Sequence, residues 1–391
     1  MPNNLLDQLK KYTVVVADTG DLQAIQKFMP QDATTNPSLI ATAAQMPEYR
    51  EIVDETLLQA KKDAGSGATE KEVAALAFAR LAVSFGKRIL DIVPQRVSVQ
   101  ADPRFSYNTE ATVRQSRFLL SEFEKAGTPR ERVMIKIAAT WEGVRAGEIL
   151  EKEGIQANMT LLFGIHQAIA CAEAGVTLIS PYVGRITDWY TKNTGQQYEG
   201  ADDPGVQSVT RIYNYYKKFD YPTEVMGASF RKISQITELA GCDLLTIGPK
   251  QLIQLQETTE ELTRKLDPTK AATMDIEKMS IDQATFEKMH ADNPMATEKL
   301  AEGIKGFSKA LESLETFLAN RLTQLESGAK VGVAATNIFA AYDFDEDGFI
   351  TREEWLGLDA IFDALDLDSD GRITPDEMMA ALGATFQMTA V

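Results

Sequence analysis

The chain has 391 residues, enough for one large domain and a small one, and it carries a net charge of −17. Its two cysteines, Cys171 and Cys242, argue against a disulfide framework, and no apolar run approaches the ~20 residues that a membrane helix needs. The acidity also argues against nucleic acid as a partner, because phosphate contacts require clustered Lys and Arg.

The amino-terminal stretch MPNNLLDQLKKYTVVVADTG lacks the charged, apolar and small-residue succession of a secretory leader. Together with the reduced cysteines, this predicts a cytoplasmic protein with no membrane segment. The oligomeric state stays open between a monomer and a homodimer.

Short β-rich segments alternate with helical patterns over the first 326 residues. Helical periodicity covers residues 141–154 and 164–175, and glycine ends both patterns. The alternation predicts parallel strand pairing, and eight such units predict a closed (β/α)8 TIM barrel of the α/β class. An open, doubly wound sheet is the alternative, but no G-x-G-x-x-G follows an early strand. The expected strands lie within residues 13–20, 31–40, 96–103, 133–140, 156–163, 177–186, 223–230 and 243–250.

Lys136 stands in the middle of the fourth expected strand, between Ile135 and Ile137. Lysine is rarely buried without a partner or a chemical role, although a lysine that extends its amine to the surface is the ordinary alternative. Burial disfavours the charged ammonium group, and the neutral amine is the form that attacks a carbonyl. Lys136 is therefore the candidate nucleophile for a Schiff base at the mouth of the barrel.

Polar side chains gather at the carboxyl ends of the expected strands, where barrel enzymes place their chemistry. Each also has an ordinary alternative, such as a helix cap for Asp18, a turn for Asn36 or a surface ion pair for Arg185. Because His166 and His290 both fall in helical segments, proton transfer is left to carboxylates and water, with Asp18 best placed. The set comprises Asp18, Thr34, Asn36, Gln100, Lys136, Asn158, Thr160, Ser180, Arg185, Ser229 and Arg231.

Seven motifs follow one another along residues 5–322: VVVADTGD, DATTNPSLI, VMIKIAATWEG, EKEGIQANMTLLF, LISPYVGRITDWY, VMGASFRKI and DNPMATEKLAEGIKGF. With these motifs the chain resembles the large transaldolases of the pentose phosphate pathway. The resemblance implies transfer of a dihydroxyacetone unit from a ketose phosphate (fructose 6-phosphate or sedoheptulose 7-phosphate) to an aldose phosphate (erythrose 4-phosphate or glyceraldehyde 3-phosphate). It implies sugar phosphates as small-molecule partners and no cofactor for catalysis, since the iminium group accepts the electrons.

The same resemblance assigns roles residue by residue. Catalytic roles fall on Lys136, which forms the Schiff base, on Asp18 as acid and base, and on Thr160, which holds the catalytic water. The substrate-binding residues are two asparagines that hold donor hydroxyl groups, a serine against the Schiff base and three residues that grip the phosphate. In that order they are Asn36, Asn158, Ser180, Arg185, Ser229 and Arg231.

Two further catalytic positions depart from the usual transaldolase pattern. Gln100 stands where most members carry a glutamate that manages the catalytic water, and Tyr182 stands where most carry phenylalanine. Glutamine can hold a water but cannot take its proton, and the tyrosine hydroxyl adds a donor beside it. The related fructose-6-phosphate aldolases carry both residues and release free dihydroxyacetone, so that activity is the alternative function.

The carboxyl-terminal segment is far more acidic than the rest of the chain. Residues 331–391 hold thirteen Asp and Glu, two Arg and no Lys, a net charge of −11, which leaves −6 for the first 330 residues. The shift predicts a boundary between a barrel domain, residues 1–326, and a small all-α domain, residues 327–391.

Two stretches of this segment, residues 343–354 and 366–377, fit the calcium-loop pattern D-x-D-x-D-G-x-I-x-x-x-E at every constrained position. The segment thereby resembles an EF-hand pair, with Ile350 and Ile373 placed to pair the two loops. The expected ligands of the first loop are Asp343, Asp345, Asp347, the Phe349 carbonyl, Thr351 and Glu354. Those of the second loop are Asp366, Asp368, Asp370, the Arg372 carbonyl, Thr374 and Glu377.

The spacing of the two loops is unusual. Only residues 355–365 separate them, which leaves room for one short helix in place of an exiting helix, a linker and an entering helix. Calcium is the expected cofactor of this domain, with magnesium as an alternative occupant. Bound calcium would stabilise the segment, regulate the barrel, or make the segment a calcium-dependent binding module anchored on the barrel.

Overall fold

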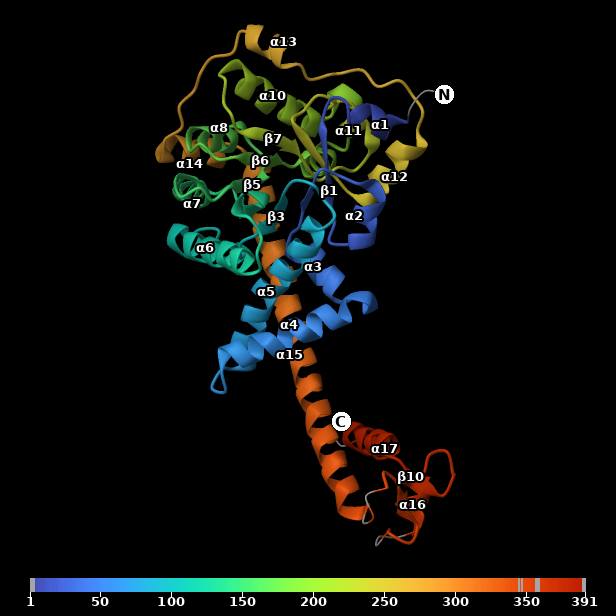
Figure 1. Ribbon diagram of the computed structural model, residues 1–391. Coiled ribbons are helices and arrows are strands. Elements are labelled where there is room, and N and C mark those ends of the chain that lie inside the picture. Colours follow the sequence, from blue (N-terminus) through green and yellow to red (C-terminus); the bar gives the residue numbers. More distant parts are fainter. Residues whose placement is uncertain (1–3, 344, 346, 356–358, 389–391) are drawn as a thin grey trace.

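The computed structural model describes residues 4–343, 345, 347–355 and 359–388. Eight parallel strands close into a barrel in which each strand pairs with the next along the chain and the eighth pairs with the first (Figure 1). This confirms the predicted TIM barrel. The strands are β1 (Val14–Asp18), β2 (Asp32–Thr34), β3 (Val97–Gln100), β4 (Val133–Ala138), β5 (Ala157–Leu162), β6 (Leu178–Pro181), β7 (Glu224–Gly227) and β8 (Leu244–Ile247).

Helices connect successive strands and cover the outside of the barrel (Figure 1). Within the described part of the chain, no helix is long and apolar enough to cross a membrane. These helices are α1 (Leu5–Leu9), α2 (Leu22–Phe28), α3 (Pro37–Ala44), α4 (Arg50–Ala64), α5 (Glu70–Leu90), α6 (Thr109–Lys125), α7 (Trp141–Lys152), α8 (Ile165–Glu173), α9 (Val183–Thr194), α10 (Pro204–Lys218), α11 (Ile233–Thr237), α12 (Pro249–Glu257), α13 (Pro268–Thr273) and α14 (Gln283–Ala291).

Three of the expected strand segments end in α-helices. Residues 31–40 contain β2 and then the start of α3, whose first residue is Pro37. Proline suits that position, because its ring presets φ and the first helical N–H has no partner in the helix. Residues 177–186 contain β6 and then the start of α9, so Arg185 lies on a helix and not at a strand end. In residues 243–250, β8 is followed by α12, which begins at Pro249.

An apolar layer fills the interior of the barrel near the amino ends of the strands. Successive side chains of a strand point to opposite faces, so residues two positions later in the same strands also point inward. The layer consists of Val16, Met134, Leu178, Met226 and Leu244, each at most 1% exposed. The residues two positions later are Asp18, Lys136, Ser180, Thr246 and, directly after the end of β7, Ala228.

A second core lies outside the barrel, where α3, α4 and α5 pack against the long helix α15 (Pro294–Tyr342). Leu311, Leu314, Leu318 and Leu322 supply the contribution of α15 to this core. The helix then continues without a break through residues 326 and 327. The division into two domains at that point therefore stays a prediction.

A small lobe lies at the far end of α15 (Figure 1). It contains β9 (Ile350–Thr351), α16 (Asp359–Leu365), β10 (Arg372–Ile373) and α17 (Pro375–Met388). The two strands pair in antiparallel fashion with Ile350 opposite Ile373, which confirms the predicted pairing of the loops. Both isoleucines are fully buried with Phe362 of α16, the single short helix that the described residues place between the loops.

Candidate functional site

Polar side chains replace the apolar layer toward the carboxyl ends of the strands. In the register of the sheet, Gln100 pairs with Lys136, and Lys136 pairs with Asn158. Paired residues of parallel strands point to the same face, so these three side chains share the interior of the barrel. Ile135 and Ile137 point the other way, into the core between strands and helices, which is how a lysine fits this apolar strand.

Lys136 is 3% exposed, and its ammonium group donates to the Thr35 carbonyl oxygen at 3.5 Å. Its amine therefore stays inside the barrel and does not extend to the surface. Burial raises the pKa of the Asp18 carboxyl, and the charge of Lys136 is the largest of the influences that oppose this rise. Asp18 does not cap the next helix, because Asp21 accepts the hydrogen bonds at the start of α2.

A chain of hydroxyl groups orients Asp18. Thr34 Oγ1 donates to Asp18 Oδ1 at 3.1 Å and lies 2.9 Å from Thr246 Oγ1. Thr246 was not among the site residues predicted from the sequence. Its signal is positional, since it follows the inward-facing Leu244 by two residues, as Lys136 follows Met134.

Asn158 is held from two sides. Its Nδ2 donates to Ser98 Oγ at 3.0 Å, and its Oδ1 accepts from Ser180 Oγ at 2.6 Å. Ser98 was also missed, although it lies two residues before Gln100 and so faces the same interior. Asn36 is held by the backbone and not by other side chains. Its Oδ1 caps α3 by accepting from the Leu39 amide at 3.0 Å.

Thr160 Oγ1 donates to the Tyr182 hydroxyl at 3.0 Å, and both residues are buried. The Oε1 atom of Gln100 is also buried and has no hydrogen-bond partner among the described residues. A buried acceptor without a partner costs free energy unless a water or a ligand supplies the donor. Gln100 thus offers an acceptor inside the barrel to a water or a substrate hydroxyl group.

The guanidinium group of Arg185 lies close to two aromatic rings. Its centre lies 5.0 Å from the centroid of the Tyr182 ring and 5.5 Å from that of Phe307 on α15. The backbone brings Arg185 close to the loop after β7, because the Gly184 amide donates to the Ser229 carbonyl oxygen at 2.9 Å. A Cβ atom at residue 184 would lie 2.3 Å from that oxygen, so only glycine permits this approach.

Arg231 extends from the same loop. It forms an ion pair with Asp188 of α9 at 2.7 Å, and its Nη1 donates to Ser229 Oγ at 3.4 Å. Both partners of the ion pair are about half exposed. A phosphate group would compete with Asp188 for this guanidinium, because both offer oxygen atoms that match its fork.

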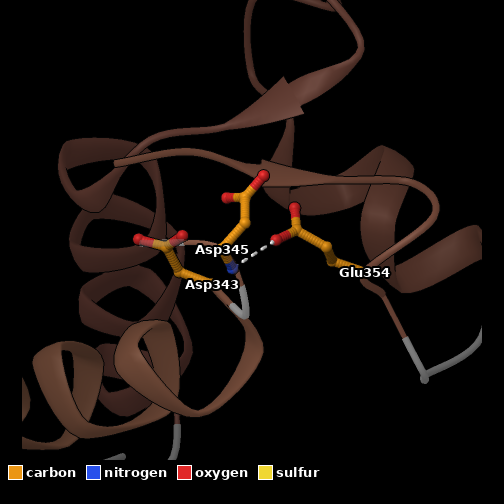
Figure 2. Close-up of side chains that lie close together, drawn as sticks. All are labelled: Asp343, Asp345 and Glu354. Carbon is orange, nitrogen blue, oxygen red and sulfur yellow. Dashed lines mark hydrogen bonds between the residues drawn. The ribbon is translucent and has the colours of Figure 1, made fainter. Parts of the chain in front are cut away.

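The first acidic loop brings Asp343, Asp345 and Glu354 together (Figure 2), with one oxygen atom of each within 4.8 Å of the others. Glu354 Oε1 accepts from the Asp345 amide at 3.4 Å (Figure 2). Asp343 is the residue after the last turn of α15, and its buried Oδ1 has no partner among the described residues. The loop turns at Gly348, whose φ of +87° is unfavourable for residues with a side chain.

The second acidic loop gathers Asp366, Asp368 and Asp370 in the same way. The other expected ligands make contacts within the loops and lie outside the two gathered sets. Thr351 and Thr374 donate to the glutamates three residues later, each at 2.8 Å. The remaining expected ligands are Asp347, which accepts from the Phe349 amide, Arg372, whose amide donates to Asp370, and Glu377, which accepts from the Leu367 amide.

The sequence model of the transaldolase/fructose-6-phosphate aldolase family matches residues 15–318, and that of the EF hand matches residues 336–356 and 358–382. A transaldolase of Thermosynechococcus vestitus is 66% identical over 386 residues, 98% of this chain and 99% of that protein. One of Synechocystis sp. is 63% identical over 391 residues, the whole of both chains. A transaldolase of Trichormus variabilis is 68% identical over 327 residues, 83% of this chain and 98% of its own.

The family match spans the barrel and its polar interior, and the relatives named transaldolase align along nearly their whole lengths. The EF-hand matches cover the two acidic loops. This chain accordingly belongs to the transaldolase family of transferases and carries EF-hand sequences at its carboxyl end.

Proposed function

We propose that the chain transfers a dihydroxyacetone unit from fructose 6-phosphate or sedoheptulose 7-phosphate to erythrose 4-phosphate or glyceraldehyde 3-phosphate, through a Schiff base on Lys136. The observation that carries the proposal is the buried Lys136 beside Asp18, a carboxyl group whose pKa is raised by burial, inside a barrel of this family. A desolvated lysine is a nucleophile for carbonyls, and a carboxyl group of raised pKa can both take and return a proton.

The cycle follows from these two groups. The Lys136 amine adds to the ketose carbonyl and water leaves, which forms an iminium ion. The Asp18 carboxylate takes the proton of the C4 hydroxyl group, the C3–C4 bond breaks, and its electrons pass into the iminium to form an enamine. The aldose phosphate departs, and an acceptor aldose phosphate then reacts by the reverse steps.

The other inward-facing residues supply binding and orientation in this proposal. Asn158, fixed between Ser98 and Ser180, presents an oriented amide to the donor hydroxyl groups, as does Asn36 at the start of α3. Thr160 with Tyr182 holds the water. Arg185, Ser229 and Arg231 grip the phosphate.

A trapping experiment tests the Schiff base. The protein is incubated with fructose 6-phosphate and sodium borohydride, digested, and examined by mass spectrometry. A reduced three-carbon adduct on Lys136, absent from the Lys136→Met variant, supports the proposal. An adduct on another lysine, or turnover that survives in Lys136→Met, contradicts it.

Fructose-6-phosphate aldolase activity is the second candidate function. The buried Oε1 of Gln100, which has no hydrogen-bond partner in the described part of the chain, and the hydrogen bond between Thr160 and Tyr182 favour it, because they arrange two neutral groups around a water site. The test measures sedoheptulose 7-phosphate and free dihydroxyacetone, with and without erythrose 4-phosphate. Rapid dihydroxyacetone release without acceptor supports aldolase activity. If the Gln100→Glu variant releases less dihydroxyacetone but still forms sedoheptulose 7-phosphate, Gln100 determines the ratio of aldolase to transaldolase activity.

For the carboxyl-terminal lobe we propose calcium binding in both loops. Carboxylate oxygens are the ligands that calcium prefers. The gathered aspartates fit such an ion, and so does Asp343 Oδ1, which is buried and makes no hydrogen bond to any residue that the structure describes. Calorimetry with calcium tests this, and Asp343→Asn with Asp366→Asn should remove the binding. Retained binding in the double variant would place the ion elsewhere.

We further propose that residues 1–326 and 327–391 are separate domains of a cytoplasmic enzyme. The relative from Trichormus variabilis aligns over 327 residues and 98% of its own length, close to the proposed length of the barrel domain. Both cysteines are free and buried, as suits a reducing compartment.

A further inference from the structure

A cavity of about 690 Å³ opens at the end of the barrel opposite the polar layer. Its walls come from residues that precede the strands, including Thr13 and Val14 at the start of β1, Gln31 before β2 and Gln95 before β3. The apolar layer inside the barrel separates this cavity from Lys136. The volume falls within the roughly 300–1,000 Å³ that small-molecule sites occupy.

Positive charge dominates the walls of this cavity. Among the described residues that line it, Lys10, Lys11, Lys217 and Arg264 are cationic, and Asp243 is the acidic one. Lys217 pairs with Asp243 at 2.8 Å. The other three cations form no ion pair within the described part of the chain, so the cavity holds an excess of positive charge in a protein whose net charge is −17.

Hydrogen bonds hold Lys10 and Arg264 in place and use only some of their N–H donors. Lys10 Nζ donates to the Phe28 carbonyl oxygen at 3.2 Å, and Arg264 Nε donates to the Leu266 carbonyl oxygen at 2.8 Å. An ammonium group has three N–H donors and a guanidinium group has five. Lys217 lies over the ring of Tyr213, 5.3 Å from its centroid. A ligand would therefore meet cations that are already oriented, which lowers the entropy cost of binding.

We propose that this cavity binds a small phosphorylated metabolite at a site separate from the catalytic one. A phosphate dianion matches both the fork of Arg264 and the ammonium groups of Lys10 and Lys11, whereas a single carboxylate would leave most of the positive charge unmatched. Nucleic acid is a poor fit, because it needs an extended basic surface and the chain as a whole is strongly acidic.

Calorimetric titration of the full chain with inorganic pyrophosphate tests the site. The buffer is kept free of calcium, because pyrophosphate would remove calcium from the acidic loops. The protein used in every titration carries Arg231→Gln, which should weaken phosphate binding at the catalytic end. This protein is the parent of the variants below. We expect pyrophosphate to bind this parent, and adding Lys11→Gln with Arg264→Gln to weaken the affinity at least tenfold.

Two variants serve as controls. Lys71→Gln removes a charge of the same kind from an exposed position of α5, outside the cavity, and should leave the affinity unchanged. Lys11→Gln alone replaces an exposed side chain and should leave the fold intact. Weaker binding of pyrophosphate by this variant would therefore reflect the lost charge and not unfolding. An unchanged affinity in the double variant, an equal loss in Lys71→Gln, or no binding to the parent would overturn the proposal.

Discussion

At Asp18, burial and neighbouring charge act on the pKa of one carboxyl group in opposite directions. Burial raises the pKa, while the charge of Lys136, the hydrogen bond from Thr34 and the charge of Arg185 lower it. The carboxylate is the form that takes the C4 hydroxyl proton in the proposed cycle, so activity should fall as the pH drops through this pKa. Because burial prevails, that fall should occur above the usual range of an aspartate.

Replacing Thr34 by Val should move the acidic limb of the pH profile upward. The variant loses a hydrogen bond that favours the carboxylate, so Asp18 keeps its proton to a higher pH. A hydrogen bond to a charged group contributes about 1.5–3 kcal/mol, so kcat/KM measured on this acidic limb should fall by up to roughly 10- to 100-fold. The measurement is kcat/KM against pH. A limb that stays in place would show that Thr34 does not act on Asp18.

At the level of elements, α15 connects the mouth of the barrel with the acidic lobe. Phe307 lies against Arg185, and Leu311 to Leu322 pack on α3, α4 and α5. Gly303 allows this helix to approach the barrel, since a Cβ there would lie 2.5 Å from Leu161 Cδ2 and 3.3 Å from Arg185 Nη1.

Two glycines of α15 should respond in opposite ways to substitution by alanine. Gly303→Ala should lower the free energy of unfolding by about 1–3 kcal/mol through overpacking and should raise KM by displacing Arg185. A Cβ at residue 306 would meet no atom of the described residues within 4 Å beyond its own helix. Gly306→Ala should therefore raise that free energy by about 0.5–1 kcal/mol, because alanine favours the helix. Urea denaturation and steady-state kinetics measure both effects. Equal responses of the two variants would argue against the close contact at residue 303.

At the scale of the whole molecule, the barrel and the acidic lobe are connected through α15. A single helix joins them, and the part of α15 that belongs to the second core ends near Leu322 and Leu325. Asp343, the first expected calcium ligand, follows the last residue of the same helix. The barrel core thus makes its contacts with α15 before the acidic segment begins, so we expect it to fold without that segment.

A chain that ends at Ala329 should keep most of its turnover and lose the response to calcium. In the full chain, calcium should raise the melting temperature of the lobe, because an ion that binds only the folded state stabilises it by about 2.7 kcal/mol at a hundredfold excess over Kd. Calorimetric scans measure the melting temperature of the lobe, and assays with calcium or with chelator measure the response of turnover. Turnover that changes with calcium in the full chain alone would favour regulation, and turnover lost on truncation would contradict the proposed boundary.

Several features of this protein were determined by its sequence alone. The repeated alternation of apolar segments and helical periods predicted the closed barrel, because strand period and helix period leave different patterns of apolar residues. The ligand spacing of the acidic loops predicted their pairing through Ile350 and Ile373. Such local patterns need no knowledge of distant contacts.

Tertiary structure decided the features that depend on residues far apart in the chain. Thr246 reaches Thr34 only when the barrel closes, Phe307 meets Arg185 only when α15 folds back on the barrel, and neither contact leaves a local pattern. The same holds for the basic cavity, whose Lys10 and Arg264 are 254 positions apart. Sequence period determines which face of an element a residue occupies, whereas the closure of the fold determines which residues meet there.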